Sequence, residues 1–123
     1  GILPFGGATI RMAREAGWGN AMRWILTGDI FDAQEAYRLG LIQKIAPEGK
    51  HLQQARILAE RIAQQAPLAV QATLAAARTA AVEGEQAGRD VLLPSLRRLI
   101  PTNDAAEGVR SFVERRTARF TGT

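Results

Sequence analysis

The 123-residue sequence contains no cysteine, which excludes a disulfide scaffold and thiolate zinc sites. This composition fits a reducing compartment, and we expect the cytoplasm. The single histidine, His51, is interpreted as a surface residue, because no serine or second ligand stands at triad or metal-site spacing. We therefore expect no metal. No apolar run is long enough to span a bilayer, so no membrane partner is expected.

The residues that are present favour one globular domain of ordinary size. Hydrophobic residues make up 46% of the chain, which argues against disorder throughout. The formal net charge is +4, and most of the positive charge comes from arginine. Such a balance favours anionic partners, including nucleotide-bearing ligands, acidic lipid and nucleic acid. A solvated surface with a mild excess of cations explains it more simply.

Capping signals divide most of the chain into helices. Asp32 and Glu35 have capping-box spacing, Asp104 and Glu107 repeat it, and Pro67 suits a first helical turn. Pro94 should kink a helix unless the helix begins there. The interruption at residues 82–88 predicts a flexible joint. Helices are expected at about residues 7–15, 20–27, 33–39, 52–66, 67–81 and 91–99, and from about residue 104.

Residues 41–45 are the one predicted strand, which Pro47 ends. The predicted fold class is therefore mostly α with a short β segment. One strand cannot make a sheet, so we expect its partners to come from another chain or from a segment outside this sequence. The sequence also begins without methionine, within a predicted loop. We therefore expect it to be part of a longer protein.

Two segments are candidates for chemistry. The opening "GILPFGG" is rich in glycine, but no lysine follows Gly7 and the spacing is not G-x-G-x-x-G, so a tight turn is favoured over a phosphate loop. The basic "VERRTARF" near the other end is either a solvated helix terminus or an anion-binding site. The carboxylates Asp29, Asp32 and Glu35 lie close together in the sequence, but capping explains two of them, Asp32 and Glu35, so no metal site is inferred. Trp18 and Trp24 are expected to pack in a core or an interface.

Several segments, in their order and spacing, resemble the crotonase superfamily, the enoyl-CoA hydratase/isomerase group. They are the proline–glycine loop, "LTG", "AQEAYRLGL" and "DAAEGVRSFVERRTARF". Ser111 and Arg115 stand where the family usually has alanine and lysine. The resemblance covers nearly the whole chain and implies the C-terminal half of an α/β fold built from a ββα spiral. Residues 1–47 would end the spiral core, and residues 48–123 would form a helical region for oligomerisation and CoA contact.

The resemblance implies an acyl-CoA enzyme that stabilises an enolate with two backbone N–H groups. Hydration of 2-enoyl-CoA is the default reaction, with a role in fatty acid metabolism. Isomerisation or other acyl-CoA lyase chemistry is the alternative. A non-catalytic basic module that binds RNA or a protein is a further alternative, although nucleic acid is the less favoured partner. We expect a homotrimer or a dimer of trimers and no cofactor apart from the coenzyme A of the substrate.

The resemblance also implies substrate-binding residues. Leu3, Pro4 and Phe5 would form a wall of the acyl pocket, and Arg115 would contact the CoA nucleotide. Arg116 would point about 100° away on a helix and serve structure or solvent. No catalytic residue is assigned, because both glutamates of the hydratases would lie upstream of Gly1. Phe5 is neither the glycine that leaves space for water nor the acid of some relatives, which argues against simple hydration.

Overall fold

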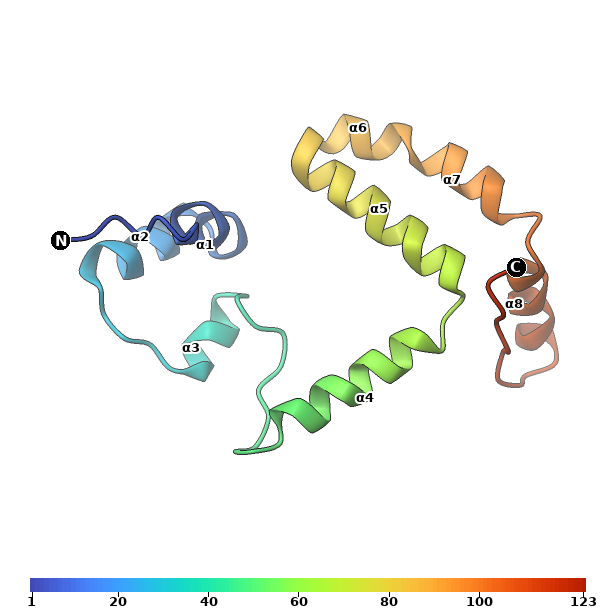
Figure 1. The fold of residues 1–123 in the computed structure, drawn as a ribbon, viewed down its shortest axis with the longest axis horizontal. Helices are drawn as coiled ribbons and strands as arrows, with labels where there is room; N and C mark the ends of the chain where they lie inside the picture. Colours follow the sequence, from blue (N-terminus) through green and yellow to red (C-terminus); the bar gives the residue numbers. More distant parts are fainter. The chain divides into compact units, whose positions relative to one another are not determined.

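A computed structural model describes residues 1–123 (Figure 1). The chain forms two compact units, Gly1–Gln54 and Ala55–Thr123, and the division falls within one helix. The structure contains eight helices: α1 (Ala8–Ala16), α2 (Trp18–Thr27), α3 (Ala33–Arg38), α4 (His51–Ala63), α5 (Pro67–Glu83), α6 (Glu85–Asp90), α7 (Leu92–Leu99) and α8 (Asn103–Val113). None of them has the length and hydrophobicity needed to cross a membrane.

The first unit is built on the pairing of α1 with α2. Ala21 of α2 is fully buried, and Gly28 ends that helix in a left-handed conformation. Asp32 caps α3 as predicted, because its carboxylate accepts the backbone N–H of Glu35 at 2.9 Å. The Glu35 side chain does not complete the capping box, since it binds Arg38 at 2.6 Å instead.

The predicted strand at residues 41–45 is absent from the structure. Its alternating apolar residues, Leu41 and Ile45, suit a strand, but a strand is defined by a hydrogen-bonded neighbour, and this chain contains none. The backbone N–H groups of Leu41 and Ile42 instead bond the carbonyl oxygen of Ala36 at the end of α3. The observed chain is therefore helical without a β segment.

The second unit is dominated by a hairpin in which α5 packs against α6 and α7 (Figure 1). The interruption predicted at residues 82–88 is almost wholly helical, because Gly84 alone separates the end of α5 from the start of α6. Gly88 of α6 is buried against α5. Pro94 stands in the first turn of α7, where its missing N–H is tolerated. Pro67 likewise begins α5.

Gly88 sets the distance between α5 and α6. A Cβ atom at this position would lie 2.5 Å from the Cβ and 3.0 Å from the Cα of Ala80. Because the neighbouring atoms are backbone or next to it, the helices would have to separate. We expect Gly88→Ala to lower the free energy of unfolding by about 1–3 kcal/mol, the usual cost of overpacking, measured by urea unfolding.

Gly108→Ala is the matched control for this substitution. Gly108 also lies within a helix, but its added Cβ would meet only a ring carbon of Phe120, at 3.9 Å. The higher helix propensity of alanine should then stabilise α8 by about 0.5–1 kcal/mol. Equal losses in the two variants would contradict the close approach of Gly88 and Ala80.

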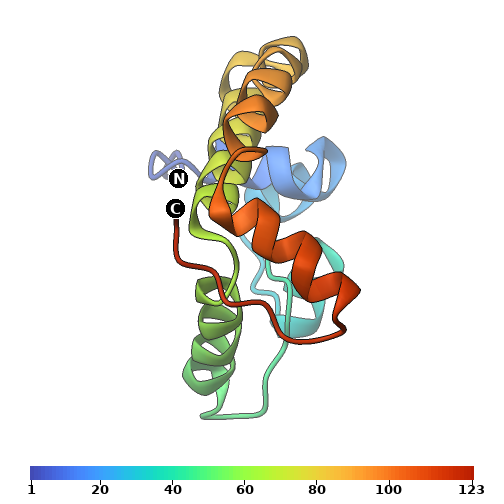
Figure 2. The same ribbon diagram turned by 90° about the vertical axis from the view of Figure 1, so that its right-hand side faces the viewer.

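The last helix, α8, is followed by a segment that turns back along it (Figure 2). Thr102, not Asp104, caps α8: its hydroxyl accepts the N–H of Ala105 at 3.1 Å. The predicted capping box of Asp104 and Glu107 does not form, because both carboxylates bind the returning segment. The residues after α8 are thereby held against the helix.

Candidate functional site

The predicted acyl-pocket residues form a tight turn ahead of α1. The N–H of Phe5 donates to the carbonyl of Leu3 at 2.7 Å across Pro4, and Gly7 has a φ of 93°. Arg11 closes the turn by donating to the carbonyl of Gly6 at 2.6 Å. This geometry agrees with a tight turn.

Phe5 is 87% exposed and Leu3 is 72% exposed, so this turn presents large apolar side chains on the surface of the unit. Their role as an acyl-pocket wall stays a prediction.

Arg115 lies just beyond α8 in a left-handed conformation, with a φ of 53°. Its N–H donates to the carbonyl of Phe112 at 3.3 Å, and the N–H of Arg116 donates to the carbonyl of Ser111 at 3.1 Å. These two bonds form a Schellman motif, in which the left-handed position is usually glycine. The expectation that Arg115 and Arg116 share a helix is therefore wrong, since α8 ends at Val113. The left-handed residue is Arg115 itself, and Arg116 follows it outside the helix.

Arg116 is a structural residue, as expected. Its guanidinium donates to both carboxylate oxygens of Glu107, at 2.5 Å and 2.9 Å, and its Nε donates to Glu114 at 2.5 Å. The side chain of Glu107 is only 15% exposed and also accepts the backbone N–H of Arg119 at 2.8 Å. Glu107 therefore binds the returning segment at two places.

The side chain of Arg115, in contrast, makes no hydrogen bond and no ion pair within the chain. The two acidic residues of this region, Glu107 and Glu114, are both occupied by Arg116. A guanidinium with no carboxylate partner can bind an anion without first breaking an ion pair. The geometry thus agrees with the anion-binding interpretation of this segment.

The electrostatics of the Glu107 pair predict a specific pH dependence. Hydrogen bonds from Arg116 and from the N–H of Arg119 lower the pKa of Glu107 from its ordinary value of 4.5 to about 2. Because the pKa is lower in the folded state, the stabilisation is present above about pH 4.5 and is lost as the pH falls through about 2. We expect Glu107→Gln to lower the Tm at neutral pH, and this difference to shrink below pH 4.5 and vanish near pH 2. Thermal unfolding followed by circular dichroism measures it.

Glu60→Gln serves as the control for this prediction, because Glu60 is an exposed glutamate of α4 that forms no ion pair. Its Tm should follow that of the wild type across the same pH range. A Tm deficit of Glu107→Gln that persists undiminished at the acid end would show that the ion pair with Arg116 is not its source.

Asp104 is a residue that the sequence reasoning did not assign correctly. It is 3% exposed, and its carboxylate accepts the N–H groups of Thr121 at 2.7 Å and Gly122 at 2.8 Å. Its own N–H donates to the carbonyl of Thr123 at 3.1 Å. The Asp104 carboxylate therefore holds the C-terminal residues of the chain against the start of α8. The sequence carries no signal for this role, because the spacing of Asp104 and Glu107 predicts a capping box instead.

The tryptophans differ in their surroundings. The rings of Trp24 and Phe31 are tilted against each other by 57°, with 5.0 Å between their centroids. The guanidinium of Arg23 lies over the Trp24 ring at 4.1 Å, and the indole N–H of Trp24 donates to Glu35 at 3.2 Å. Trp18 is 74% exposed and therefore does not pack in a core of this chain. The Arg38 hydrogen bond, assisted by that of Trp24, lowers the pKa of Glu35. Asp29, Asp32 and Glu35 all make hydrogen bonds within the chain. No group of three or more histidine, cysteine, aspartate or glutamate side chains is placed to hold a metal ion.

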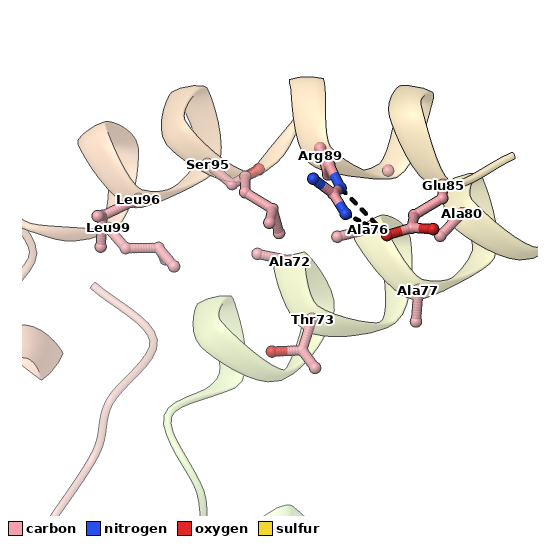
Figure 3. Close-up of a pocket in the computed structure, with 12 residues that line it drawn as sticks. Ala72, Thr73, Ala76, Ala77, Ala80, Glu85, Arg89, Ser95, Leu96 and Leu99 are labelled. Atoms are coloured by element: carbon pink, nitrogen blue, oxygen red, sulfur yellow. Dashed lines mark hydrogen bonds and ion pairs between the residues drawn. The ribbon is translucent and has the colours of Figure 1, made fainter.

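A groove of about 460 Å³ runs along the hairpin of the second unit (Figure 3). Small residues of α5 form one wall, and Leu96 and Leu99 of α7 form the other. The ion pair of Glu85 and Arg89 lies at one end. Most of the residues that line the groove are small or apolar.

Comparison with known proteins gives a consistent result. The whole chain, residues 1–123, matches the model of the family described as enoyl-CoA hydratase/isomerase. It is 34% identical over 122 residues to the 2,3-dehydroadipyl-CoA hydratase of Escherichia coli. That alignment covers 99% of this chain and 48% of the E. coli protein. It is 35% identical to a mitochondrial enoyl-CoA hydratase of Pongo abelii, over 98% of this chain and 41% of that protein.

The solved structures agree. A probable enoyl-CoA hydratase/isomerase from Mycobacterium abscessus superimposes with a TM-score of 0.93 at 55% identity, over 99% of this chain and 47% of the other. An enoyl-CoA hydratase from Bacillus anthracis superimposes with a TM-score of 0.90 at 32% identity, over 99% of this chain and 47% of the other. The chain thus spans about half the length of the relatives it matches. With its sequence motifs, its helical architecture and these matches in agreement, the chain belongs to the enoyl-CoA hydratase/isomerase family.

Proposed function

We propose that this chain is the C-terminal part of a crotonase-type acyl-CoA enzyme whose reaction is hydration of 2-enoyl-CoA. The observation that carries the proposal is the family match over the whole chain, to relatives that include enoyl-CoA hydratases. The unpaired guanidinium of Arg115 supports it, since acyl-CoA carries a 3′-phosphate and a diphosphate. A cytoplasmic location, and assembly as a homotrimer or dimer of trimers, belong to the same proposal.

The remainder of the acyl-CoA site would come from an N-terminal segment of the same protein. The chain has no paired carboxylates placed for general acid and base work on a substrate, because its acidic clusters are engaged by arginine or by backbone N–H groups. The oxyanion-hole donors and the proton-transferring carboxylates would lie in that segment. Residues 1–47 would then complete the spiral core, and residues 48–123 would supply CoA contact and oligomerisation.

Phe5, with Leu3 and Pro4, would line the acyl pocket next to the reacting carbons. Its exposed ring in the present unit supports this role, because an 87% exposed phenylalanine needs an apolar neighbour or ligand. A ring at this position would exclude space that a glycine leaves open. Enoyl-CoA isomerisation or another lyase reaction is the alternative chemistry, because Phe5 does not leave the space for water that a glycine leaves. Phe5 also supplies no acid for isomerisation, so the carboxylates of the N-terminal segment would decide between the reactions.

The test is an assay with crotonyl-CoA that follows loss of the enoyl absorbance. We expect the longer protein that supplies the N-terminal segment to hydrate crotonyl-CoA, and the 123-residue chain alone to be inactive. In the longer protein, Phe5→Gly should change chain-length preference or hydration rate more than stability. Absence of hydration together with migration of the double bond would replace hydration by isomerisation. Turnover by the chain alone well above background would refute the proposed division of the site.

A further inference from the structure

The backbone at Arg115 is unusual among the turns of this chain. Seven other residues have a positive φ, and all seven are glycines; Arg115 is the one exception. A left-handed conformation brings the Cβ of an arginine too close to the backbone, whereas glycine has no such atom. Glycine would therefore be the favourable residue at this turn, as at the others. A residue other than glycine held in this conformation points to a role for its side chain.

A clamp around the turn holds this strained conformation. Glu107, in the middle of α8, accepts the guanidinium of Arg116 on both carboxylate oxygens, and its Oε1 also accepts the N–H of Arg119 at 2.8 Å. The segment is thus attached to α8 directly after Arg115 and again four residues on. Glu114 accepts a third hydrogen bond from the Arg116 guanidinium, at 2.5 Å. With the backbone fixed after the turn, Arg115 cannot relax into an ordinary conformation without breaking these bonds.

The same clamp keeps the charge of Arg115 available. Arg116 occupies both neighbouring carboxylates, so Glu107 and Glu114 cannot compete with an incoming anion for Arg115. Arg116 is partly shielded, with 37% of its side chain exposed, and its donors are directed at Glu107 and Glu114 and at the carbonyl of Thr117. Of the two adjacent arginines, one is structural and the other is left free.

We propose that Glu107 and Arg116 are positioning residues for Arg115: their ion pair fixes the left-handed turn that presents Arg115, unpaired, to the phosphates of the acyl-CoA nucleotide. This inference rests on the proposed function. It extends that function by assigning two residues that touch no substrate but determine how tightly the nucleotide is held. Their contribution should depend on the presence of Arg115 and on the presence of substrate phosphates.

The experiment compares variants in the longer, active protein, with an acyl-CoA and with the corresponding acyl-pantetheine, which lacks the nucleotide phosphates. We expect Glu107→Gln and the milder Arg116→Lys to raise the KM for acyl-CoA roughly tenfold, as loss of a supporting partner of a binding group does elsewhere. The kcat, and the KM for acyl-pantetheine, should not change. Adding Glu107→Gln to Arg115→Ala should cause no further rise in KM.

Arg119→Ala is the matched control, because Arg119 takes part only through its backbone N–H, which alanine keeps. It should leave both KM values unchanged. If Arg115→Ala raises the KM for acyl-CoA but Glu107→Gln and Arg116→Lys do not, the positioning role is overturned and the proposed function stands. If Arg115→Ala has no effect either, the nucleotide contact itself fails. A loss that is equal for both substrates shows a role in folding alone and overturns the inference.

Discussion

Arg115→Ala is expected to raise the KM for acyl-CoA by about tenfold to a hundredfold while kcat stays nearly constant. Removing a charge-assisted contact to a phosphate costs roughly 1.5–3 kcal/mol of binding free energy. The nucleotide is remote from the reacting carbons, so ground state and transition state lose the same contact and only KM rises. Steady-state kinetics of the longer protein with acyl-CoA measure the effect. An acyl-pantetheine substrate should not respond to the substitution.

The backbone of Arg115 offers a control that separates binding from stability. Arg115→Gly also removes the guanidinium, but glycine relieves the left-handed strain, which is about 1–2 kcal/mol, less the entropy that glycine gains in the unfolded chain. The two variants should therefore have the same raised KM, while the glycine variant is the more stable of the two. If the KM follows stability instead, Arg115 acts through folding and the phosphate contact is refuted.

Interactions that span a few residues could be predicted from the sequence. Asp32 caps α3 because its acceptor and the N–H of Glu35 are three residues apart, and no distant group competes for them. The end of α2 at Thr27 and the start of α5 at Pro67 were predicted for the same reason. Each of these features depends on local backbone geometry, which the neighbouring residues determine.

Interactions that depend on distant parts of the chain could not be predicted in this way. Asp104 and Glu107 have the same capping-box spacing as Asp32 and Glu35, yet their carboxylates bind residues that follow α8. The chain turns at Arg115, and the residues after it run back along α8. The sequence does not indicate that the backbone of an arginine adopts the left-handed conformation at this turn. The helix α6 was missed because Gly88, a helix breaker by propensity, is required where α6 approaches Ala80.

The residues of the candidate site were assigned from the family resemblance, and their roles stay predictions. The resemblance pointed to Arg115 as the residue that binds the nucleotide, and the structure adds that its side chain is unpaired and its backbone strained. The clamp of Glu107 and Arg116 has no sequence signal, because its two members are nine residues apart and meet only after the chain turns. The strand at residues 41–45 was wrongly predicted because strand propensity cannot supply a partner strand.

The last prediction concerns Asp104, whose replacement should have the largest effect on stability. Asp104→Ala removes the acceptor of the N–H groups of Thr121 and Gly122, and Asp104 is 3% exposed. A hydrogen bond to a charged acceptor contributes about 1.5–3 kcal/mol, so the loss of both bonds should lower the free energy of unfolding by roughly 2–5 kcal/mol, measured with urea. Amide hydrogen exchange at Thr121 and Gly122 should accelerate at the same time.

Asn103→Ala is the matched control for Asp104→Ala, because it changes the preceding residue of the same helix turn. Asn103 is exposed and bonds the hydroxyl of Thr123 at 3.2 Å, so its loss should cost at most about 1 kcal/mol and leave the two amides protected. The full loss with Asp104→Ala requires residues 120–123 to stay close to α8. If the two amides exchange freely while the unfolding free energy is unchanged, the segment detaches without cost. In that case the residues that Asp104 binds do not contribute to the stability of α8. The backbone conformation of Arg115 would then depend only on the bonds that Glu107 makes to Arg116 and Arg119.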